Sequence, residues 1–274
     1  MPLLQRHGFY TKKGLGQHFL TSRKALMAIM DACGIEDGTP VLEIGPGIGT
    51  VTREMAERGA YVTAVELDAK AIAVLHETVG GFPRVQVHHA DILTIDLSAL
   101  LGDDCWTVVG NLPYYITTPV IARMLDFTEQ IRCAVFMVQR EVAERMAAPP
   151  GSKIYGSLSV FVQVFAEVER VARVPRGAFL PPPTVESTVV LMRMRPEPLV
   201  PPELRTTFFR VVRAAFGQRR KTLENALAGG GVLGGDRQAV TQVLNAVGII
   251  PSRRGETLDI GEFLRIAREV AQRQ

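Results

Sequence analysis

The feature that most constrains the fold is a regular alternation of strand-like and helix-like segments, which begins at Pro40. The strand candidates are short runs rich in valine, at residues 40–44, 61–66, 85–89, 107–109 and 134–138. The helix candidates carry apolar residues at helical spacing, at residues 50–57, 69–79, 118–125 and 141–147. Because parallel strands need crossover helices, this alternation predicts an α/β fold with a mostly parallel sheet covered on both faces.

Further segments flank this region on both sides. Residues 22–33 have a helical pattern with Ser22 as the expected N-cap. Residues 158–165 predict another helix, and residues 168–174 and 187–194 predict two strands that form an antiparallel hairpin at the edge of the sheet.

The composition changes after residue 195, and this change marks the expected domain boundary. Prolines at positions 196, 198, 201 and 202 are typical of a stiff linker. Beyond them, helical patterns cover residues 203–216, 221–227, 236–247 and 259–273. We therefore expect two domains, one over residues 1–195 that contains the sheet and a small all-helical one over residues 203–274.

Charge is unevenly distributed, although the net charge is only +3. From Pro201 onward there are 12 Lys and Arg against 7 Asp and Glu, and the first 25 residues carry five basic side chains and no acid. Basic ends around a near-neutral middle indicate either a polyanionic partner or solvated helix faces.

Other features exclude several classes of protein. No apolar run is long enough to span a membrane, and no secretion signal is expected at the N-terminus. The three cysteines, Cys33, Cys105 and Cys133, are too far apart for zinc-type spacing, and their odd number is unlike a disulfide framework. We therefore expect a cytoplasmic protein without a metal centre.

A glycine-rich turn follows the first strand of the alternating region. Gly45, Gly47 and Gly49 allow the backbone to approach a ligand at the carboxyl end of that strand. Glu66 ends the next strand, where an acid can accept hydrogen bonds from the ribose hydroxyls of an adenosine-containing cofactor. Asp91 follows the third strand and can accept a hydrogen bond from the adenine amine. These residues fit either a nicotinamide dinucleotide or S-adenosyl-L-methionine.

The segment Asn111-Leu112-Pro113-Tyr114 follows the fourth strand and favours S-adenosyl-L-methionine. An adenine amine is a poor nucleophile because its lone pair is delocalised into the ring. The Asn111 side-chain oxygen and the Leu112 carbonyl can each accept one of its N–H bonds, and Pro113 has no N–H to compete. The Tyr114 ring can stack on the base. The alternative is an ordinary turn in which Asn and Pro have their usual roles.

With this motif the sequence resembles the KsgA-like rRNA adenine N6,N6-dimethyltransferases over nearly its whole length. Further similar segments are Gly16-Gln17-His18-Phe19-Leu20, Met137 to Arg145, Gly151 to Gly156, Phe179 to Ser187 and Ala215 to Leu223. The resemblance implies a Rossmann-like S-adenosylmethionine-dependent methyltransferase sheet with a small all-helical C-terminal domain. It also implies that the enzyme dimethylates two adjacent adenines near the 3′ end of small-subunit (16S) rRNA.

The resemblance also implies the roles of particular residues. The cofactor contacts fall on Gln17, His18, Leu20, Gly45, Gly47, Glu66, Asp91 and Asn111. Phe179 would form the second wall of the base pocket, opposite Tyr114, although ordinary core packing is the alternative. This chain departs from the family pattern at His18, where many members have Asn, and at Tyr115, which is more usually Asn.

RNA contacts are expected from exposed basic residues, because phosphate contacts supply affinity and register. The candidates are Lys12, Lys13, Arg219, Arg220, Lys221, Arg253 and Arg254. Three consecutive cations just before a predicted helix are unfavourable for the helix dipole and so indicate an external anion. The partner implied by the resemblance is rRNA within an immature 30S-type particle, bound by a monomeric enzyme.

Other functions remain open at this point. The same pocket could serve a large-subunit rRNA or DNA adenine N6-methyltransferase, or the fold could belong to a non-catalytic RNA-binding factor. A dehydrogenase is a more distant alternative, because nothing in the sequence indicates a site for a hydride acceptor.

Overall fold

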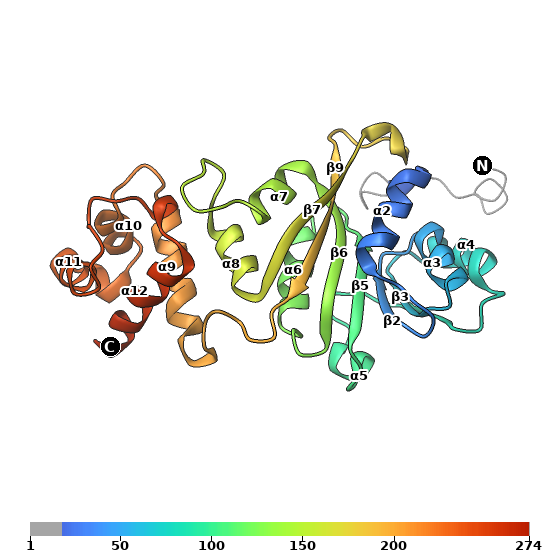
Figure 1. Ribbon diagram of the computed structural model, residues 1–274, viewed down its shortest axis with the longest axis horizontal. Helices are drawn as coiled ribbons and strands as arrows, with labels where there is room; N and C mark the ends of the chain where they lie inside the picture. The colour runs from blue at the N-terminus through green and yellow to red at the C-terminus, as the bar shows by residue number, and fades with distance from the viewer. Residues whose placement is uncertain (1–17, 274) are drawn as a thin grey trace. The chain divides into compact units, whose positions relative to one another are not determined.

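A computed structural model describes residues 18–273 and divides them into two compact units (Figure 1). The first unit comprises the described residues up to Ala143 together with Glu167–Pro196. The second unit comprises Glu144–Ala166 and the described residues from Glu197 onward. No helix among residues 18–273 is long and apolar enough to cross a membrane.

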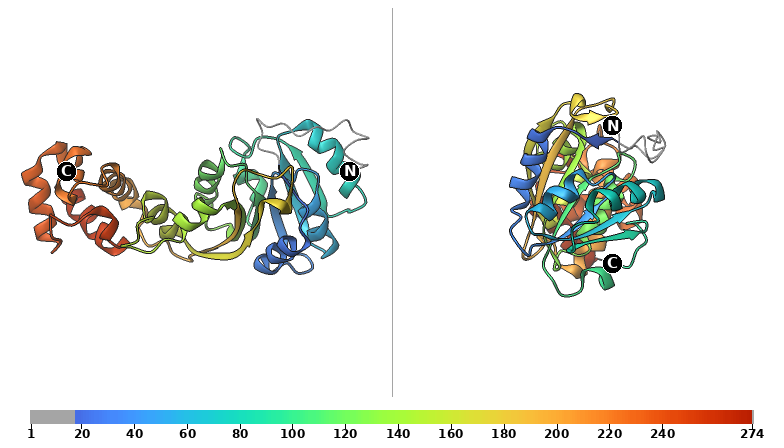
Figure 2. Two further views of the ribbon diagram at one scale, coloured as in Figure 1. Left: turned by 90° about the horizontal axis from the view of Figure 1, so that it is seen from above. Right: turned by 90° about the vertical axis from the view of Figure 1, so that its right-hand side faces the viewer.

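The first unit is built on a seven-stranded sheet with helices on both faces (Figure 2). Its strands in spatial order are β4 (Val85–His89), β3 (Tyr61–Glu66), β2 (Pro40–Ile44), β5 (Trp106–Asn111), β6 (Ile131–Gln139), β9 (Ser187–Met194) and β7 (Ala166–Val174). The five strands from β4 to β6 are parallel, and β9 is antiparallel to β6. The predicted α/β fold with a mostly parallel sheet is confirmed.

The connections between strands place a crevice at the middle of the sheet. From β2 the chain moves outward to β3 and β4, then crosses back to β5 on the other side of β2. Open α/β sheets bind ligands outside the carboxyl ends of the strands at such a switch point. The ends of β2, β3 and β5 therefore define the place where a ligand is expected.

The helices of the first unit are α2 (Arg23–Cys33), α3 (Thr50–Glu57), α4 (Ala69–Val79), α5 (Leu97–Leu101), α6 (Thr117–Leu125) and α7 (Arg140–Met146), the last of which crosses into the second unit. Three of them, α2, α4 and α5, begin with a Ser or Asp cap. The expected cap is confirmed, since the Ser22 side chain accepts a hydrogen bond from the Ala25 N–H. Leu26, Ile29 and Met30 of α2 belong to the core cluster under the sheet.

The far edge of the sheet carries the two predicted edge strands. Cross-strand ion pairs join Arg193 to Glu169 at 3.8 Å and Arg195 to Glu167 at 3.1 Å. The residue numbers rise on β9 as they fall on β7, so these two strands run antiparallel, as expected.

A separate two-stranded ladder closes the N-terminal segment onto the chain after β7. Phe19–Leu20 (β1) pairs antiparallel with Phe179–Leu180 (β8), which follows the short 3-10 turn η2 (Arg176–Ala178). The Thr21 N–H extends this ladder with a 2.8 Å hydrogen bond to the Ala178 carbonyl. This ladder holds residues 18–20 beside the carboxyl edge of the sheet.

The second unit is all-helical. Its elements are α8 (Ser157–Phe165), η3 (Pro202–Leu204), α9 (Arg205–Gly217), α10 (Leu223–Gly229), η4 (Val232–Gly235), α11 (Arg237–Ala246), η5 (Gly255–Thr257) and α12 (Ile260–Gln272). Asp236 and Asp259 cap α11 and α12 by accepting backbone N–H groups.

The division of the chain differs from the one expected at residue 195. Residues 144–166 belong to the helical unit, because α8 contributes apolar side chains to its core. The Phe161 and Phe165 rings lie 5.3 and 6.2 Å from the Phe209 ring of α9. The Leu199 N–H also donates to the Val164 carbonyl at 2.9 Å. A pattern-based boundary misses such packing between distant segments.

Candidate cofactor and active site

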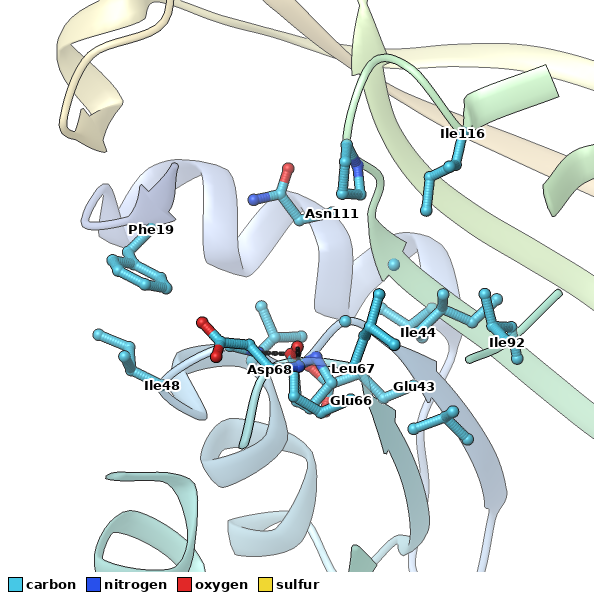
Figure 3. Close-up of a pocket in the computed structure, with 18 of the residues that line it drawn as sticks. Phe19, Glu43, Ile44, Ile48, Glu66, Leu67, Asp68, Ile92, Asn111 and Ile116 are labelled. Atoms are coloured by element: carbon cyan, nitrogen blue, oxygen red, sulfur yellow. Dashed lines mark hydrogen bonds between the residues drawn. The ribbon is translucent and has the colours of Figure 1, made fainter. Parts of the chain in front are cut away.

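A pocket lies at the carboxyl ends of β2, β3 and β5, where the sheet topology places a ligand site (Figure 3). Phe19 and Asn111 lie on one side of it, and Glu66 and Asp68 lie on the opposite side. Of the predicted cofactor residues, the structure brings together in this lining His18, Leu20, Gly45, Gly47, Glu66, Asp91 and Asn111. Gln17 lies outside the described residues.

The glycine-rich turn has the backbone conformation that the sequence implied. Gly45 and Gly47 have φ values of +66° and +57°, which side-chain-bearing residues rarely adopt. A Cβ on Gly47 would lie 2.9 Å from the Phe19 ring, so only glycine lets the turn pack under β1. At Gly45 a Cβ would meet nothing within 4 Å, which leaves this backbone open to the pocket.

Glu66 organises the turn from the end of β3. One carboxylate oxygen accepts the Gly47 N–H at 3.0 Å, and the other accepts the Asp68 N–H at 2.9 Å. Its side chain is buried, and this burial raises its pKa above the ordinary value. Each carboxylate oxygen has a second lone pair, so the group can still accept hydrogen bonds from a ligand.

Glu43 is a second buried acid at the end of β2, and it also lines the pocket. It is 3% exposed, and its Oε2 atom has no hydrogen-bond partner among the described residues. Desolvation raises the pKa of this carboxyl to about 8, with a smaller contribution from the charge of Glu66. Glu43 is therefore largely protonated at neutral pH while the pocket holds no cation.

The charge of the lining selects between the two classes of cofactor. Besides the protonated Glu43, three acids, Glu66, Asp68 and Asp91, line the pocket, and no Lys or Arg of the described part of the chain does so. A dinucleotide would bring a doubly charged pyrophosphate into this acidic site. S-adenosyl-L-methionine carries a sulfonium and an ammonium group, so it has the complementary charge.

Asn111 ends β5 and is held by the N-terminal segment. Its side-chain Nδ2 donates a hydrogen bond to the His18 carbonyl at 2.8 Å, and the His18 Nδ1 lies 2.8 Å from the Pro181 carbonyl oxygen. Because Nδ2 is used in this way, the Asn111 Oδ1 is left as an acceptor. The Leu112 N–H donates to the Met137 carbonyl at 3.2 Å, which fixes the following turn to β6.

The aromatic residues around this turn differ in position. Tyr115 is 57% exposed and lines the pocket, whereas Tyr114 is outside the lining, with its ring 6.1 Å from the His18 ring. Phe179 is also outside the lining and is 4% exposed within the core cluster. This burial matches the core-packing alternative, and the expected role of Phe179 as the wall of the base pocket stays a prediction.

The predicted RNA-binding residues fall into two groups. Arg219 donates to the carbonyls of Lys153 and Tyr155, both at 2.9 Å, and lies 3.4 Å from Glu256. Arg253 forms an ion pair with Glu262, with N–O distances of 2.5 and 3.0 Å. Both side chains thus hold parts of the second unit together.

The second group is free to meet a ligand. Arg220, Lys221 and Arg254 are exposed and have no ion pair or side-chain hydrogen bond among the described residues. Arg220 and Lys221 lie in the turn between α9 and α10, which begins after them at Leu223. Lys12 and Lys13 lie outside the described residues.

Several pocket residues were not predicted as cofactor contacts, and three of them bear on the chemistry of the site. Phe19 lies between the predicted His18 and Leu20, Asp68 caps α4, and Glu43 precedes the glycine-rich turn. A strand-end acid in an otherwise apolar strand was the available signal for Glu43. Asp68 has the sequence of an ordinary helix cap, so its place in the pocket follows only from the fold.

Comparison with known proteins identifies the family. The family model described as "Ribosomal RNA adenine dimethylase" matches residues 8–271. A ribosomal RNA small subunit methyltransferase A of Geobacillus thermodenitrificans strain NG80-2 is 44% identical over 271 residues, which cover 97% of this chain and 92% of the relative. One of Bacillus cereus strain B4264 is 42% identical, with 97% and 93% covered.

Two solved structures are similar over almost the whole chain. A dimethyladenosine transferase from Plasmodium falciparum has a TM-score of 0.78 and 25% identity, with 93% of this chain and 98% of the other covered. The 23S rRNA methyltransferase ErmE has a TM-score of 0.72 and 28% identity, with 93% and 100% covered.

The chain belongs to the ribosomal RNA adenine dimethylase family. It is thus an S-adenosyl-L-methionine-dependent methyltransferase that acts on ribosomal RNA, and its expected Rossmann-like methyltransferase fold with a helical C-terminal part is confirmed.

Proposed function

We propose that this enzyme dimethylates the N6 amines of two adjacent adenines near the 3′ end of small-subunit rRNA, within an immature small-subunit particle. The names of its relatives support the choice of subunit. The single observation that carries the chemistry is the position of Asn111, whose Nδ2 is tied to the His18 carbonyl. The enzyme acts as a monomer in the cytoplasm.

The residues of the pocket hold S-adenosyl-L-methionine through complementary groups. Glu66 accepts hydrogen bonds from the ribose hydroxyls, and Asp91 accepts one from the adenine amine. The backbone of Gly45, Gly47, His18 and Leu20 lies in close contact with the cofactor. Gln17 is assigned to the same contact set by family resemblance. The acidic lining favours the positive charges of this cofactor, and the cofactor supplies a methyl group on a positively charged sulfur.

The target adenine is splayed out of the RNA and placed against the turn after β5. The Asn111 Oδ1 and the Leu112 carbonyl accept hydrogen bonds from the two N–H groups of the amine and so orient its lone pair. Pro113 keeps the turn stiff. Tyr114 stacks on the base. The amine becomes acidic on methyl transfer, so positioning supplies most of the rate and no strong base is needed. The burial of Phe179 supports a packing role beside this site rather than direct stacking.

RNA phosphates are bound by the exposed cations Arg220, Lys221 and Arg254, with Lys12 and Lys13 contributing from the N-terminal segment. Arg219 and Arg253 support this surface by holding its loops in place, since their donors are engaged within the second unit.

The deciding experiment measures transfer of radiolabelled methyl groups to three substrates: undermethylated small subunits, large-subunit RNA and naked DNA. Mass spectrometry of the small-subunit RNA then gives the number of methyl groups on each adenine. We expect dimethyladenosine only on the small-subunit substrate. Methylation of large-subunit RNA instead would assign the enzyme the substrate named for ErmE.

A further inference from the structure

The helical unit contains a hollow of about 300 Å³ beside α9, and its lining along that helix ends at Gln218, where the turn that carries Arg220 and Lys221 begins. Its lining consists of basic, amide and very small side chains: Arg210, Arg213, Ala214, Gly217, Gln218, Ala226, Gly229 and Gly230. No carboxylate of the described residues lines it. The positions 210, 213, 214 and 217 recur at helical spacing, so one stripe of α9 forms its wall.

Arg210 has an unusual environment in this wall. Its Nε and Nη2 atoms are buried and have no hydrogen-bond partner among the described residues. Buried guanidinium N–H groups without an acceptor are unfavourable, since they lose hydration without a compensating hydrogen bond. Arg213, one turn further along α9, is exposed and also has no ion pair among residues 18–273. The wall thus holds two cations whose charges are not balanced by the protein.

The opposite wall is made of glycine where α10 ends. A Cβ on Gly230 would lie 2.4 Å from the Cβ of Ala214, and a Cβ on Gly229 would lie 2.8 Å from the Gln218 Nε2. Larger residues would therefore push the helices apart or displace the Gln218 amide. The absence of side chains at Gly229 and Gly230 leaves room for the Gln218 amide, which lines the same hollow as the two arginines.

A second groove on the protein provides a contrast. Arg140 and Arg176 line a hollow in the first unit, but Glu141 and Glu186 line it as well, and Arg140 pairs with Glu186 at 2.9 Å. Its cations are matched by acids. Of these two hollows, only the one beside α9 combines arginines that have no ion pair with an amide donor and no acid among the described residues.

We propose that the α9 hollow is a phosphate-binding site, in which Arg210, Arg213 and Gln218 bind a phosphodiester of the rRNA substrate. Guanidinium groups match the charge and the several acceptor oxygens of a phosphate. The identification of RNA as the ligand rests on the proposed function. The affinity of the hollow for a phosphate group does not. The site adds to the helical unit an anchor formed by residues other than the exposed cations of the adjacent α9–α10 turn.

The test compares full-length Arg210→Gln and Arg213→Gln with the wild type in binding undermethylated small-subunit rRNA over a range of salt concentrations. Each variant should weaken binding and lower the slope of log affinity against log salt by about one. The control is Arg268→Gln, which removes an exposed cation of α12 in the same unit and should leave that slope unchanged. Wild-type slopes in both pocket variants would overturn the assignment to RNA.

A second arm tests the phosphate group alone. Inorganic phosphate should raise the unfolding temperature of the wild type and of Arg268→Gln, but not that of Arg210→Gln. Arg213→Gln changes only an exposed side chain, so it remains interpretable if Arg210→Gln fails to fold. Stabilisation by phosphate with unchanged RNA binding would identify a site for free phosphate and reject the RNA as its occupant.

Absence of both effects would reject the site altogether. Failure of the proposed function is recognised separately, because it would appear as absent methylation of small-subunit RNA by the wild type. The binding and unfolding measurements do not depend on turnover.

Discussion

The side-chain amide of Asn111 donates a 2.8 Å hydrogen bond to the carbonyl of His18, a residue 93 positions earlier in the chain. This contact joins the end of β5 to the N-terminal segment that lines the cofactor pocket. Because Nδ2 is the donor in this bond, the Asn111 Oδ1 is the end of the amide that remains as an acceptor. The adenine-orienting group and the cofactor pocket are therefore parts of one connected structure.

Replacing Asn111 with Asp tests this connection. The carboxylate keeps the size of the side chain but cannot donate to the His18 carbonyl, so the side chain loses its anchor. We expect methyl transfer to fall by about 100-fold or more, as for removal of a positioned polar group at other active sites. The control is Asn245→Asp, the same chemical change at an exposed site in the second unit. Near-normal single-turnover rates for Asn111→Asp would refute the role of the amide.

Glu66 should control cofactor affinity through the glycine-rich turn. Glu66→Ala removes the acceptors of the Gly47 and Asp68 N–H groups, each worth about 1–3 kcal/mol when left unpaired in a buried place. We expect at least a tenfold loss of S-adenosyl-L-methionine affinity by calorimetry. Glu66→Gln should be intermediate, because its single oxygen can serve only one of the two donors. Equal affinities for all three proteins would contradict this arrangement.

Glu43 should make stability depend on pH. Because its folded-state pKa is raised from 4.5 to about 8, the folded protein holds this proton more tightly than the unfolded chain does. Its contribution to the free energy of unfolding is therefore greatest below pH 4.5 and falls as the pH rises to about 8. Glu43→Gln removes this loss, so the variant should gain stability relative to the wild type across that window.

Denaturant unfolding of both proteins between pH 4.5 and 8.5 measures this difference. Glu129→Gln, at an exposed position, is the control and should differ from the wild type by a constant amount. A constant difference for Glu43→Gln as well would show that the pKa of Glu43 is not raised in the folded protein.

Arg253 and Arg254 are neighbours with different predicted roles. Arg253→Gln breaks the pair with Glu262, which also accepts the Asp259 N–H in the capping box of α12, so we expect a loss of about 2 kcal/mol in unfolding free energy. Arg254→Gln should leave unfolding unchanged and instead flatten the salt dependence of RNA binding. Each variant is the control for the other, and exchanged outcomes would reverse the two assignments.

Sequence patterns predicted the parallel part of the sheet well. The bounds of the strands at residues 40–44, 61–66 and 85–89 agree with the structure, because runs of β-forming residues there are bounded by turn residues on both sides. The acids and glycines at these strand ends were predicted as pocket residues for the same reason, and the structure places them together.

Features that depend on contacts between distant segments could not be predicted. The five-residue α5 is too short to show a helical period, and the two-residue pairing of β1 with β8 has no local pattern at all. Burial of Phe179 follows from that pairing. The hydrogen bonds of Arg219 likewise involve carbonyl groups 64 and 66 residues away in the chain. A run of basic residues in the sequence indicates only that these side chains are exposed, not which of them bind other parts of the protein.

The ladder between β1 and β8 has a consequence for the order in which the site is completed. Phe19 and Leu20 leave the ribosome early, but their partner strand, Phe179–Leu180, is synthesised about 160 residues later. A nascent chain that ends before residue 179 can form the Asn111–His18 hydrogen bond but lacks the strand that pairs with Phe19 and Leu20. The enzyme cannot assemble its full pocket until almost the entire first unit has been translated.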